Sequence, residues 1–201
     1  MPSVGLTKGV PRAFVRLHNQ AMALRPRPDL EAAIRSRIAR IAVGPSTVRG
    51  TPRGTAEAAR RFLRQLPLRS FRARNREAFV RSLDRETTRL QAALPAGGRR
   101  WGVARKLLNI YVRDCVYSAH LRSAYSLGQI EPFCEVPLDS ITAKELRGSD
   151  EGAALPAWPG VGRLTPEVSA HYQAVATHIA RARKLHVVHL DVFWWSEDRD
   201  T

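Results

Sequence analysis

Residues 101–125, WGVARKLLNIYVRDCVYSAHLRSAY, form the longest proline-free stretch of the chain that favours a helix. Their apolar side chains recur around the whole helix and leave no wide polar face, which is typical of a helix buried at the centre of a domain. A thin polar line still follows it at helical steps of three and four: Lys106, Asn109, Arg113, Tyr117 and His120. We therefore expect a central helix over about 101–126, with polar side chains that either line a cleft or extend to the surface.

The sequence on both sides of this stretch predicts more helices and no strands. Helical periodicity and helix-start signals predict helices over residues 11–24, 29–43, 55–66, 75–94, 140–147 and 165–184. The apolar tail at 187–195 is too short to assign, although Asp191 could cap a final turn. Because there are no alternating strand patterns and no internal repeat, we predict an all-α fold, a single compact helical domain over residues 1–201.

Length and composition limit the class of protein. The chain has 201 residues, of which 44% are hydrophobic, enough for one domain with a real core. No run reaches the roughly 18 uncharged apolar residues of a membrane span, and the start lacks the apolar part of a signal peptide. We expect a cytoplasmic protein without a membrane partner, associated with the nucleoid if bacterial. Cys115 and Cys134 are expected in the core, and no histidine has zinc-site spacing, so we expect no metal or other cofactor.

The positive charge lies almost entirely in the first half of the chain. Residues 1–100 hold 22 basic and 6 acidic residues, a net charge of +16, whereas residues 101–201 hold 11 basic and 12 acidic residues, a net charge of −1. Such an asymmetry indicates a polyanionic partner, and we expect nucleic acid, DNA in preference to RNA. The oligomeric state is not indicated. The arginines that we expect to contact the phosphate backbone are Arg49, Arg53, Arg72, Arg74, Arg76, Arg99 and Arg100.

The loop at 44–55, GPSTVRGTPRGT, leads into a helix for which Thr55 is the expected N-cap. Backbone N–H groups, hydroxyls and two arginines at a helix start suit a phosphate group. The glycine spacing is not that of a P-loop. We therefore interpret the loop as a clamp for the nucleic-acid backbone, with an ordinary surface loop as the alternative.

Lys106 and Asp139 are the candidate catalytic residues. A neutral lysine is a good nucleophile towards an anomeric carbon, and burial favours its neutral form. Asp139 follows Pro137-Leu138 and is the expected N-cap of the helix SITAKELR. A carboxylate there could stabilise the positive charge that develops when the bond between a sugar and its base breaks. The alternative is purely structural: a buried ion pair of Lys106, and a cap without catalytic role at Asp139.

Around these residues the sequence resembles the helix-hairpin-helix/Gly-Pro-Asp superfamily of DNA glycosylases. VPLDSITAKEL looks like the aspartate turn of that family, and the lysine in ARKLLNIY looks most like its archaeal-type 8-oxoguanine glycosylase branch. The resemblance covers residues 99–147. It implies an all-helical, two-lobed fold with a DNA cleft, base flipping, a Schiff base on Lys106 and electrostatic help from Asp139. The hairpin that the family carries before its lysine is absent here, and the nearest such string, PGVG, is downstream at 159–162.

Other residues on the polar line permit other functions. Asn109, Arg113 and His120 are expected to orient a substrate, and Trp158, in a loop rich in Pro and Gly, could stack on a base. Arg113 and His120 also resemble the catalytic Arg-x6-His pair of HEPN ribonucleases. Three functions therefore stay open: a DNA glycosylase/lyase, a helical nucleic-acid-binding protein without catalysis, and a HEPN-type RNase.

Overall fold

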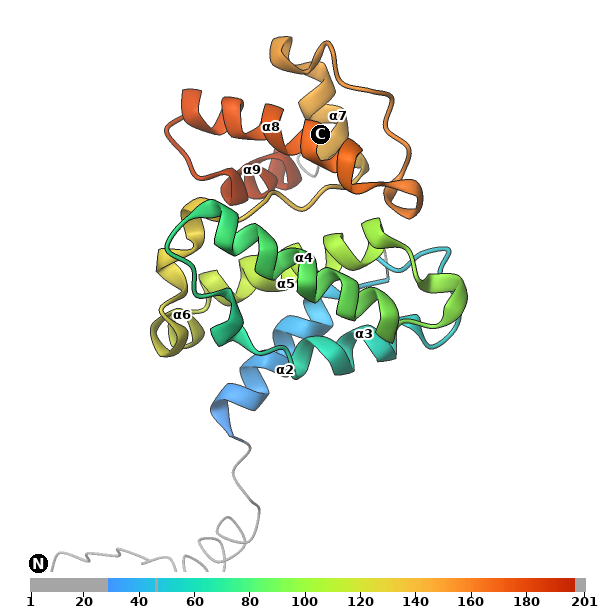
Figure 1. Ribbon diagram of the computed structural model, residues 1–201, viewed down its shortest axis with the longest axis vertical. Coiled ribbons are helices and arrows are strands. Elements are labelled where there is room, and N and C mark those ends of the chain that lie inside the picture. Colours follow the sequence, from blue (N-terminus) through green and yellow to red (C-terminus); the bar gives the residue numbers. More distant parts are fainter. Residues whose placement is uncertain (1–28, 46, 198–201) are drawn as a thin grey trace, which may run out of the picture. The chain divides into compact units, whose positions relative to one another are not determined.

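The fold is all-α, as predicted. The computed structural model describes residues 29–45 and 47–197, and within them all regular elements are helices and there is no strand (Figure 1). The architecture below is that of the described residues within 31–201, which belong to one compact unit. The helix expected over 11–24 lies outside the described residues. No helix in the described part of the chain is long and apolar enough to cross a membrane.

The longer helices match most of the predicted ones. They are α2 (Leu30–Ala42), α3 (Thr55–Arg64), α4 (Arg76–Ala93), α5 (Trp101–Tyr117), α6 (Ala119–Tyr125), α7 (Ser140–Gly148), α8 (Pro166–Ala182) and α9 (Leu190–Glu197). Short 3-10 turns connect them: η1 (Leu68–Phe71), η2 (Ala96–Gly98), η3 (Leu127–Gln129), η4 (Glu131–Phe133), η5 (Asp150–Gly152), η6 (Val161–Arg163) and η7 (Val187–His189). The unassigned tail is therefore a 3-10 turn followed by a helix, with Asp191 in its first turn.

The structure confirms the predicted N-cap at Asp139 but not the one at Thr55. The Asp139 carboxylate accepts hydrogen bonds from the backbone N–H groups of Ile141 and Thr142, and Thr165 caps α8. The prediction for Thr55 is wrong. Gly54 is the N-cap of α3, at a φ of 87° that favours glycine, and the Thr55 hydroxyl donates to a backbone carbonyl instead.

The helices α4 and α2 differ in the size of the side chains that they bury. The α4 residues Phe79, Leu83 and Leu90 are buried. On α2, Ile38 is buried but Ile41 is 57% exposed, and the small residues Ala39 and Ala42 make the close contacts instead. Arg35 turns inward and donates to the Leu66 carbonyl oxygen at 2.8 Å. A buried backbone carbonyl thus gains a partner from a residue that looks like surface in the sequence.

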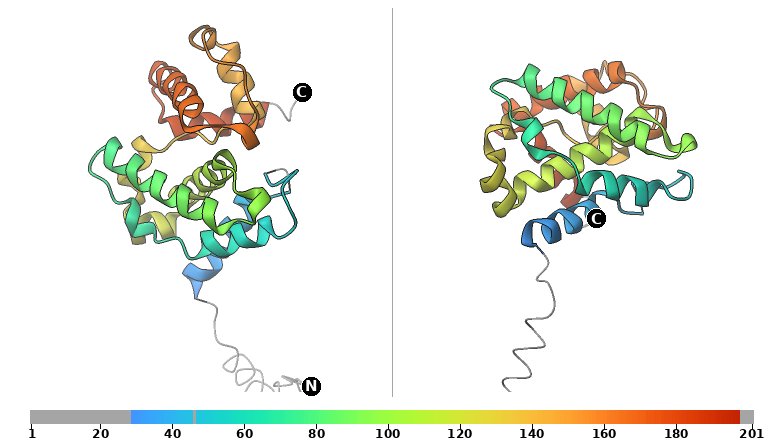
Figure 2. Two further views of the ribbon diagram at one scale, coloured as in Figure 1. Left: turned by 45° about the vertical axis from the view of Figure 1, so that its right-hand side comes forward. Right: turned by 60° about the horizontal axis from the view of Figure 1, so that its bottom comes forward.

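Two apolar cores form within residues 31–201. The first joins α2 to α6 and the turns between them, and the second joins α7, α8 and α9. Figure 2 shows the two helical groups, connected by the chain that follows η4. That connection, residues 134–139, is buried throughout, with Cys134 in the first core and Val136 and Leu138 in the second. α5 runs through the first core beside this connection, so it lies where the two groups of helices meet.

The central helix is shorter than predicted because it breaks at Ser118. α5 ends at Tyr117, and Ser118 has an extended ψ of 111°. Its hydroxyl oxygen accepts a hydrogen bond from the Leu121 N–H and caps α6. Serine is a strong N-cap residue that competes with the backbone hydrogen bonds of a continuous helix. As a consequence His120 belongs to α6, is exposed, and does not continue the line of residues on α5.

Candidate active site on the central helix

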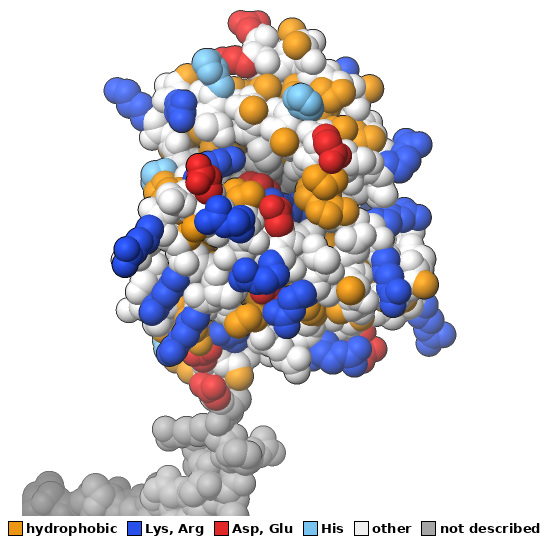
Figure 3. All heavy atoms as spheres, viewed as in Figure 1, with side chains coloured by type: hydrophobic (Ala, Val, Ile, Leu, Met, Phe, Trp, Pro, Cys, Tyr) orange, Lys and Arg blue, Asp and Glu red, His pale blue; other side chains and the backbone are white. Residues whose placement is uncertain are grey.

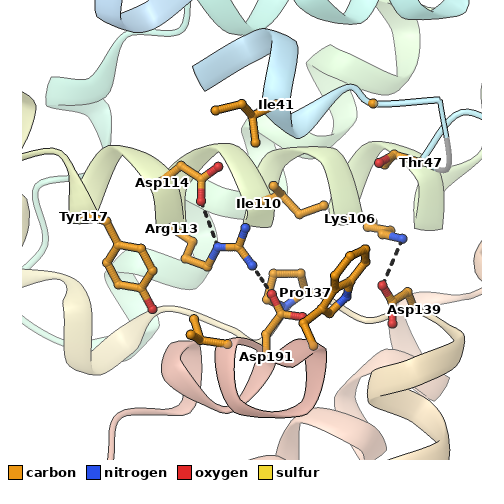
Figure 4. Close-up of a pocket in the computed structure, with 13 residues that line it drawn as sticks. Ile41, Thr47, Lys106, Ile110, Arg113, Asp114, Tyr117, Pro137, Asp139 and Asp191 are labelled. Atoms are coloured by element: carbon orange, nitrogen blue, oxygen red, sulfur yellow. Dashed lines mark hydrogen bonds and ion pairs between the residues drawn. The ribbon is translucent and has the colours of Figure 1, made fainter. Parts of the chain in front are cut away.

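One face of α5 forms a wall of a pocket of about 550 Å³, a size common for small-ligand sites (Figure 4). The opposite wall comes from the connection 134–139 and from α9, and the end of α2 closes one side. The lining residues are Ile41, Gly44, Thr47, Lys106, Ile110, Arg113, Asp114, Tyr117, Pro137, Asp139, Asp191, Val192 and Trp195. Both predicted catalytic residues therefore face the same pocket.

Lys106 and Asp139 form an ion pair at one end of the pocket. The distance between Lys106 Nζ and Asp139 Oδ2 is 3.2 Å, and each side chain is only 11% exposed. The other carboxylate oxygen, Oδ1, accepts the two capping hydrogen bonds from α7, each at 3.0 Å. The two oxygens thus have separate tasks: one fixes the carboxylate to α7, and the other faces the lysine (Figure 4).

The surroundings of Asp139 favour its ionised form. Burial by itself raises the pKa of this carboxyl group, but the Lys106 ammonium, the Thr142 backbone N–H and the Trp195 indole N–H together bring the pKa below its usual value. Asp139 is therefore a carboxylate at neutral pH. It can stabilise a positive charge that develops on a substrate in the pocket.

The opposite end of the pocket holds one arginine between two carboxylates. Arg113 donates to Asp114 at 2.9 Å and pairs with Asp191, the first-turn residue of α9 (Figure 4). Burial raises the pKa of Asp114, an effect that Arg113 offsets only in part. The two carboxylates outnumber the guanidinium, so this end of the pocket is rich in hydrogen-bond acceptors.

Apolar side chains lie between the two polar ends. Ile110 and Pro137 line the pocket, together with Trp195, whose side chain is 36% exposed. Trp158 is the predicted stacking residue, but the tryptophan that lines the pocket is Trp195. The signal for Trp195 was its spacing of four residues from Asp191, which places both side chains on one face of a helix. Because the tail at 187–195 was not assigned to a helix, this spacing could not be interpreted as a shared helix face.

Asn109 is not in the pocket, contrary to prediction. At about 100° per residue, Asn109 lies about 60° from Lys106 but only about 40° from Arg105 around α5. Its side chain accordingly joins that of Arg105, and its amide donates to Glu135 Oε2 at 3.0 Å. The helical steps of three and four were correct, but a step of three moves the side chain far enough to leave the pocket face.

Trp158 and His120 also lie apart from the pocket lining. Trp158 packs edge-to-face on Tyr172, with ring centroids 5.3 Å apart, and belongs to the edge of the second core. His120 is separated from Arg113 by the break at Ser118. Arg113 itself is engaged by two carboxylates. The HEPN-type arrangement of Arg113 and His120 therefore stays a prediction that the pocket does not favour, and loss of RNA cleavage in His120→Ala is its test.

The seven predicted phosphate-binding arginines are all exposed. They form two groups at opposite ends of α4, which has 18 residues and so a length of about 27 Å. One group precedes α4: Arg72, Arg74 and Arg76. The other lies beyond its end, directly after η2 and in the loop 44–54 that packs on η2: Arg49, Arg53, Arg99 and Arg100. Figure 3 shows basic side chains spread over the face in view rather than gathered in one stripe.

A buried ion pair lies on the side of α5 that faces away from the pocket. Arg105 donates to both carboxylate oxygens of Glu135, at 2.9 and 2.8 Å, and to Asp84 at 2.7 Å. Burial alone raises the pKa of Glu135, but the Arg105 guanidinium and the Asn109 amide bring it below its usual value. Sequence reasoning missed this network because its members are 30 and 21 residues apart along the chain.

The Glu135 pair predicts how stability depends on pH. Because the folded-state pKa of Glu135 is lowered, the pair stabilises the fold above the ordinary glutamate pKa of about 4.3, and this contribution is lost as the pH falls through the folded-state value. Glu135→Gln should reduce the free energy of unfolding at pH 7 by about 3–5 kcal/mol. Urea unfolding at pH 7 and pH 3.5 should show a smaller pH-dependent loss in the variant than in the wild type. Equal losses in both proteins would contradict this assignment.

No family model matches the chain, and no curated protein or solved structure is significantly similar to it. The function is therefore inferred from the pocket itself. Within the described ranges no three His, Cys, Asp or Glu side chains come together as a group of metal ligands.

Proposed function

We propose that the protein is a DNA glycosylase with lyase activity, in which Lys106 is the nucleophile and Asp139 the stabilising carboxylate. The observation that carries the proposal is the 3.2 Å contact between Lys106 Nζ and Asp139 Oδ2 inside a shared pocket. Lys106 lies on α5 and Asp139, 33 positions later, is the N-cap of α7, so each is held by a different helix. An ion pair with a merely structural role does not need a pocket beside it.

The proposed reaction requires a change in the protonation of Lys106, which is paired with Asp139. An ammonium group has no free lone pair, so Lys106 must release a proton to solvent before it attacks, and Asp139 stays ionised. Attack then forms a bond between Nζ and C1′ of the sugar and breaks the bond between C1′ and the base, which leaves with the electron pair. Ionised Asp139 stabilises the positive charge on the sugar during this step.

The rest of the pocket suits a base attached to that sugar. Lys106 and Arg113 are seven residues apart on α5, which is about 10 Å along the helix axis. The apolar side chains of Ile110, Pro137 and Trp195 lie between them and offer surfaces for a flat ring. The carboxylates of Asp114 and Asp191 favour a base edge that carries N–H donors.

The test is trapping of the covalent intermediate. We expect a borohydride-stable adduct between the protein and a duplex with an abasic site, and release of the base from a duplex that carries 8-oxoguanine or uracil. Undamaged duplex of the same sequence is the control. No adduct and no base release on any of these substrates would eliminate the proposal.

A nucleic-acid-binding protein without catalysis is the second candidate, favoured by the exposure of all seven predicted arginines. The same basic surface serves both candidates, since a glycosylase must also hold the phosphate backbone. Strong, salt-sensitive binding of DNA without adduct formation would support this candidate over the glycosylase.

The position of the pocket predicts which arginines matter most. Gly44 and Thr47 line the pocket, so the loop that carries Arg49 and Arg53 adjoins it. Replacing both arginines by Gln should weaken DNA binding and lower the slope of log K against log salt by about 0.9 per lost phosphate contact. The matched pair Arg72→Gln/Arg74→Gln removes the same charge beyond the far end of α4 and should have a smaller effect. Fluorescence anisotropy at several salt concentrations compares the two double variants. Equal effects on DNA binding would contradict a DNA path beside the pocket.

A further inference from the structure

The connection 134–139 is tied to α5 at Glu135, four residues before Asp139. The Glu135 carboxylate accepts three hydrogen bonds from α5: two from Arg105 and one, at 3.0 Å, from Asn109. Both members of the ion pair are buried, with side-chain exposures of 6% for Arg105 and 7% for Glu135. This contact therefore fixes the start of the connection against the side of the central helix.

The next residue is tied to α8. The Gln173 side-chain amide donates to the Val136 carbonyl oxygen at 2.8 Å and accepts from the Val136 N–H at 3.2 Å. Both backbone groups of Val136 are satisfied by this one side chain. Pro137 and Leu138 follow, and both are buried. The connection is thus held from both sides immediately before it reaches Asp139.

The two carboxylates of the connection meet neighbouring residues of α5. Arg105 pairs with Glu135, and Lys106 pairs with Asp139. Consecutive residues of a helix point about 100° apart, so the two carboxylates contact α5 at positions about 100° apart around its axis. A displacement of the connection at Glu135 therefore moves Asp139 relative to Lys106.

We propose that the Arg105–Glu135 ion pair, together with Asn109 and Gln173, is a positioning element that holds Asp139 in place against Lys106. Replacing a buried ion pair by apolar residues of similar volume is often neutral or stabilising, so stability alone does not account for such a pair. Three directed hydrogen bonds, unlike an apolar contact, define one position of the connection. The effect of this element on catalysis rests on the proposed function, whereas its effect on the Lys106–Asp139 contact does not.

The test uses the apolar double variant Arg105→Met/Glu135→Leu. The variant should stay folded by circular dichroism. Carboxyl-carbon NMR should show the pKa of Asp139 rising towards that of an ordinary aspartate, because the Lys106 ammonium no longer lies against it. The rate of adduct formation on abasic-site DNA should fall about a hundredfold, a loss typical of a misplacement of about 1 Å, with DNA affinity unchanged.

Two further variants make the result decisive. Glu86→Leu removes another buried carboxylate, which forms ion pairs with Arg85 and Arg89 on its own helix, α4, and should change neither the Asp139 pKa nor the rate. Asn109→Leu removes a single bond to Glu135 and should reproduce both changes to a smaller degree, even if the double variant fails to fold. An unchanged Asp139 pKa and rate would overturn the inference. If the wild type forms no adduct, the proposed function fails, and the Asp139 pKa alone decides the inference.

Discussion

Lys106→Ala should abolish the borohydride-trapped adduct on DNA with an abasic site. Without the ε-amine no Schiff base forms, and removal of a nucleophile costs on the order of a millionfold in well-studied hydrolases, so we expect adduct formation to fall below detection. Gel electrophoresis of the trapped complex measures the amount of adduct. The effect on DNA affinity should be small, because the exposed arginines that we expect to hold the phosphates are untouched.

Lys144 provides a matched control. It is an exposed lysine on α7, the helix that Asp139 caps, but it does not line the pocket with Lys106. Lys144→Ala should trap as efficiently as the wild type. An adduct that survives in Lys106→Ala, or that disappears equally in Lys144→Ala, contradicts the role of Lys106.

Asp139→Asn should lower the rate of base release by about a hundred- to a thousandfold, the range found when one preorganised electrostatic partner is removed from an active site. Asparagine keeps the size of the side chain and is itself a good N-cap, so α7 should start at the same residue. The variant therefore separates the charge of Oδ2 from the capping role of Oδ1. Single-turnover base release and thermal unfolding measure the two separately.

Asp139→Ala is the comparison for that experiment. It removes both the charge and the cap, and should lower stability by about 1 kcal/mol beyond any loss in Asp139→Asn. Its rate of base release should match that of Asp139→Asn, because both lack the carboxylate. If Asp139→Asn releases the base at the wild-type rate, Asp139 is a cap and the structural alternative for this residue is correct.

Much of the fold follows from local sequence patterns. The α4 stripe of Phe79, Leu83 and Leu90 and the caps at Asp139 and Thr165 are each set by residues within one or two turns. Local patterns do not predict the fold correctly where two local signals compete. Ser118 ends α5 without a proline or glycine nearby, because its side chain offers the backbone an alternative partner.

The candidate site was predictable in part: Lys106, Asp139 and Arg113 all line the pocket, but the carboxylate from α9 at the Arg113 end was not predicted. Lys106 and Asp139 stand out because of a charged residue on an apolar helix and a turn sequence that resembles a known family. The partner of Arg113 at the other end is Asp191, 78 residues away, and no periodicity connects them. Asn109 was assigned to the wrong side of α5 because Glu135, which attracts it, gives no sign in the sequence that it is buried.

The central claim is that Lys106 is the residue that bonds to the sugar. Mass spectrometry of the protease-digested, borohydride-trapped complex identifies the modified residue directly. We predict that the sugar fragment is attached to Lys106 Nζ. Attachment to Lys144, Lys184 or the N-terminal amine, or a wild-type protein that forms no adduct with abasic-site DNA, would contradict the account.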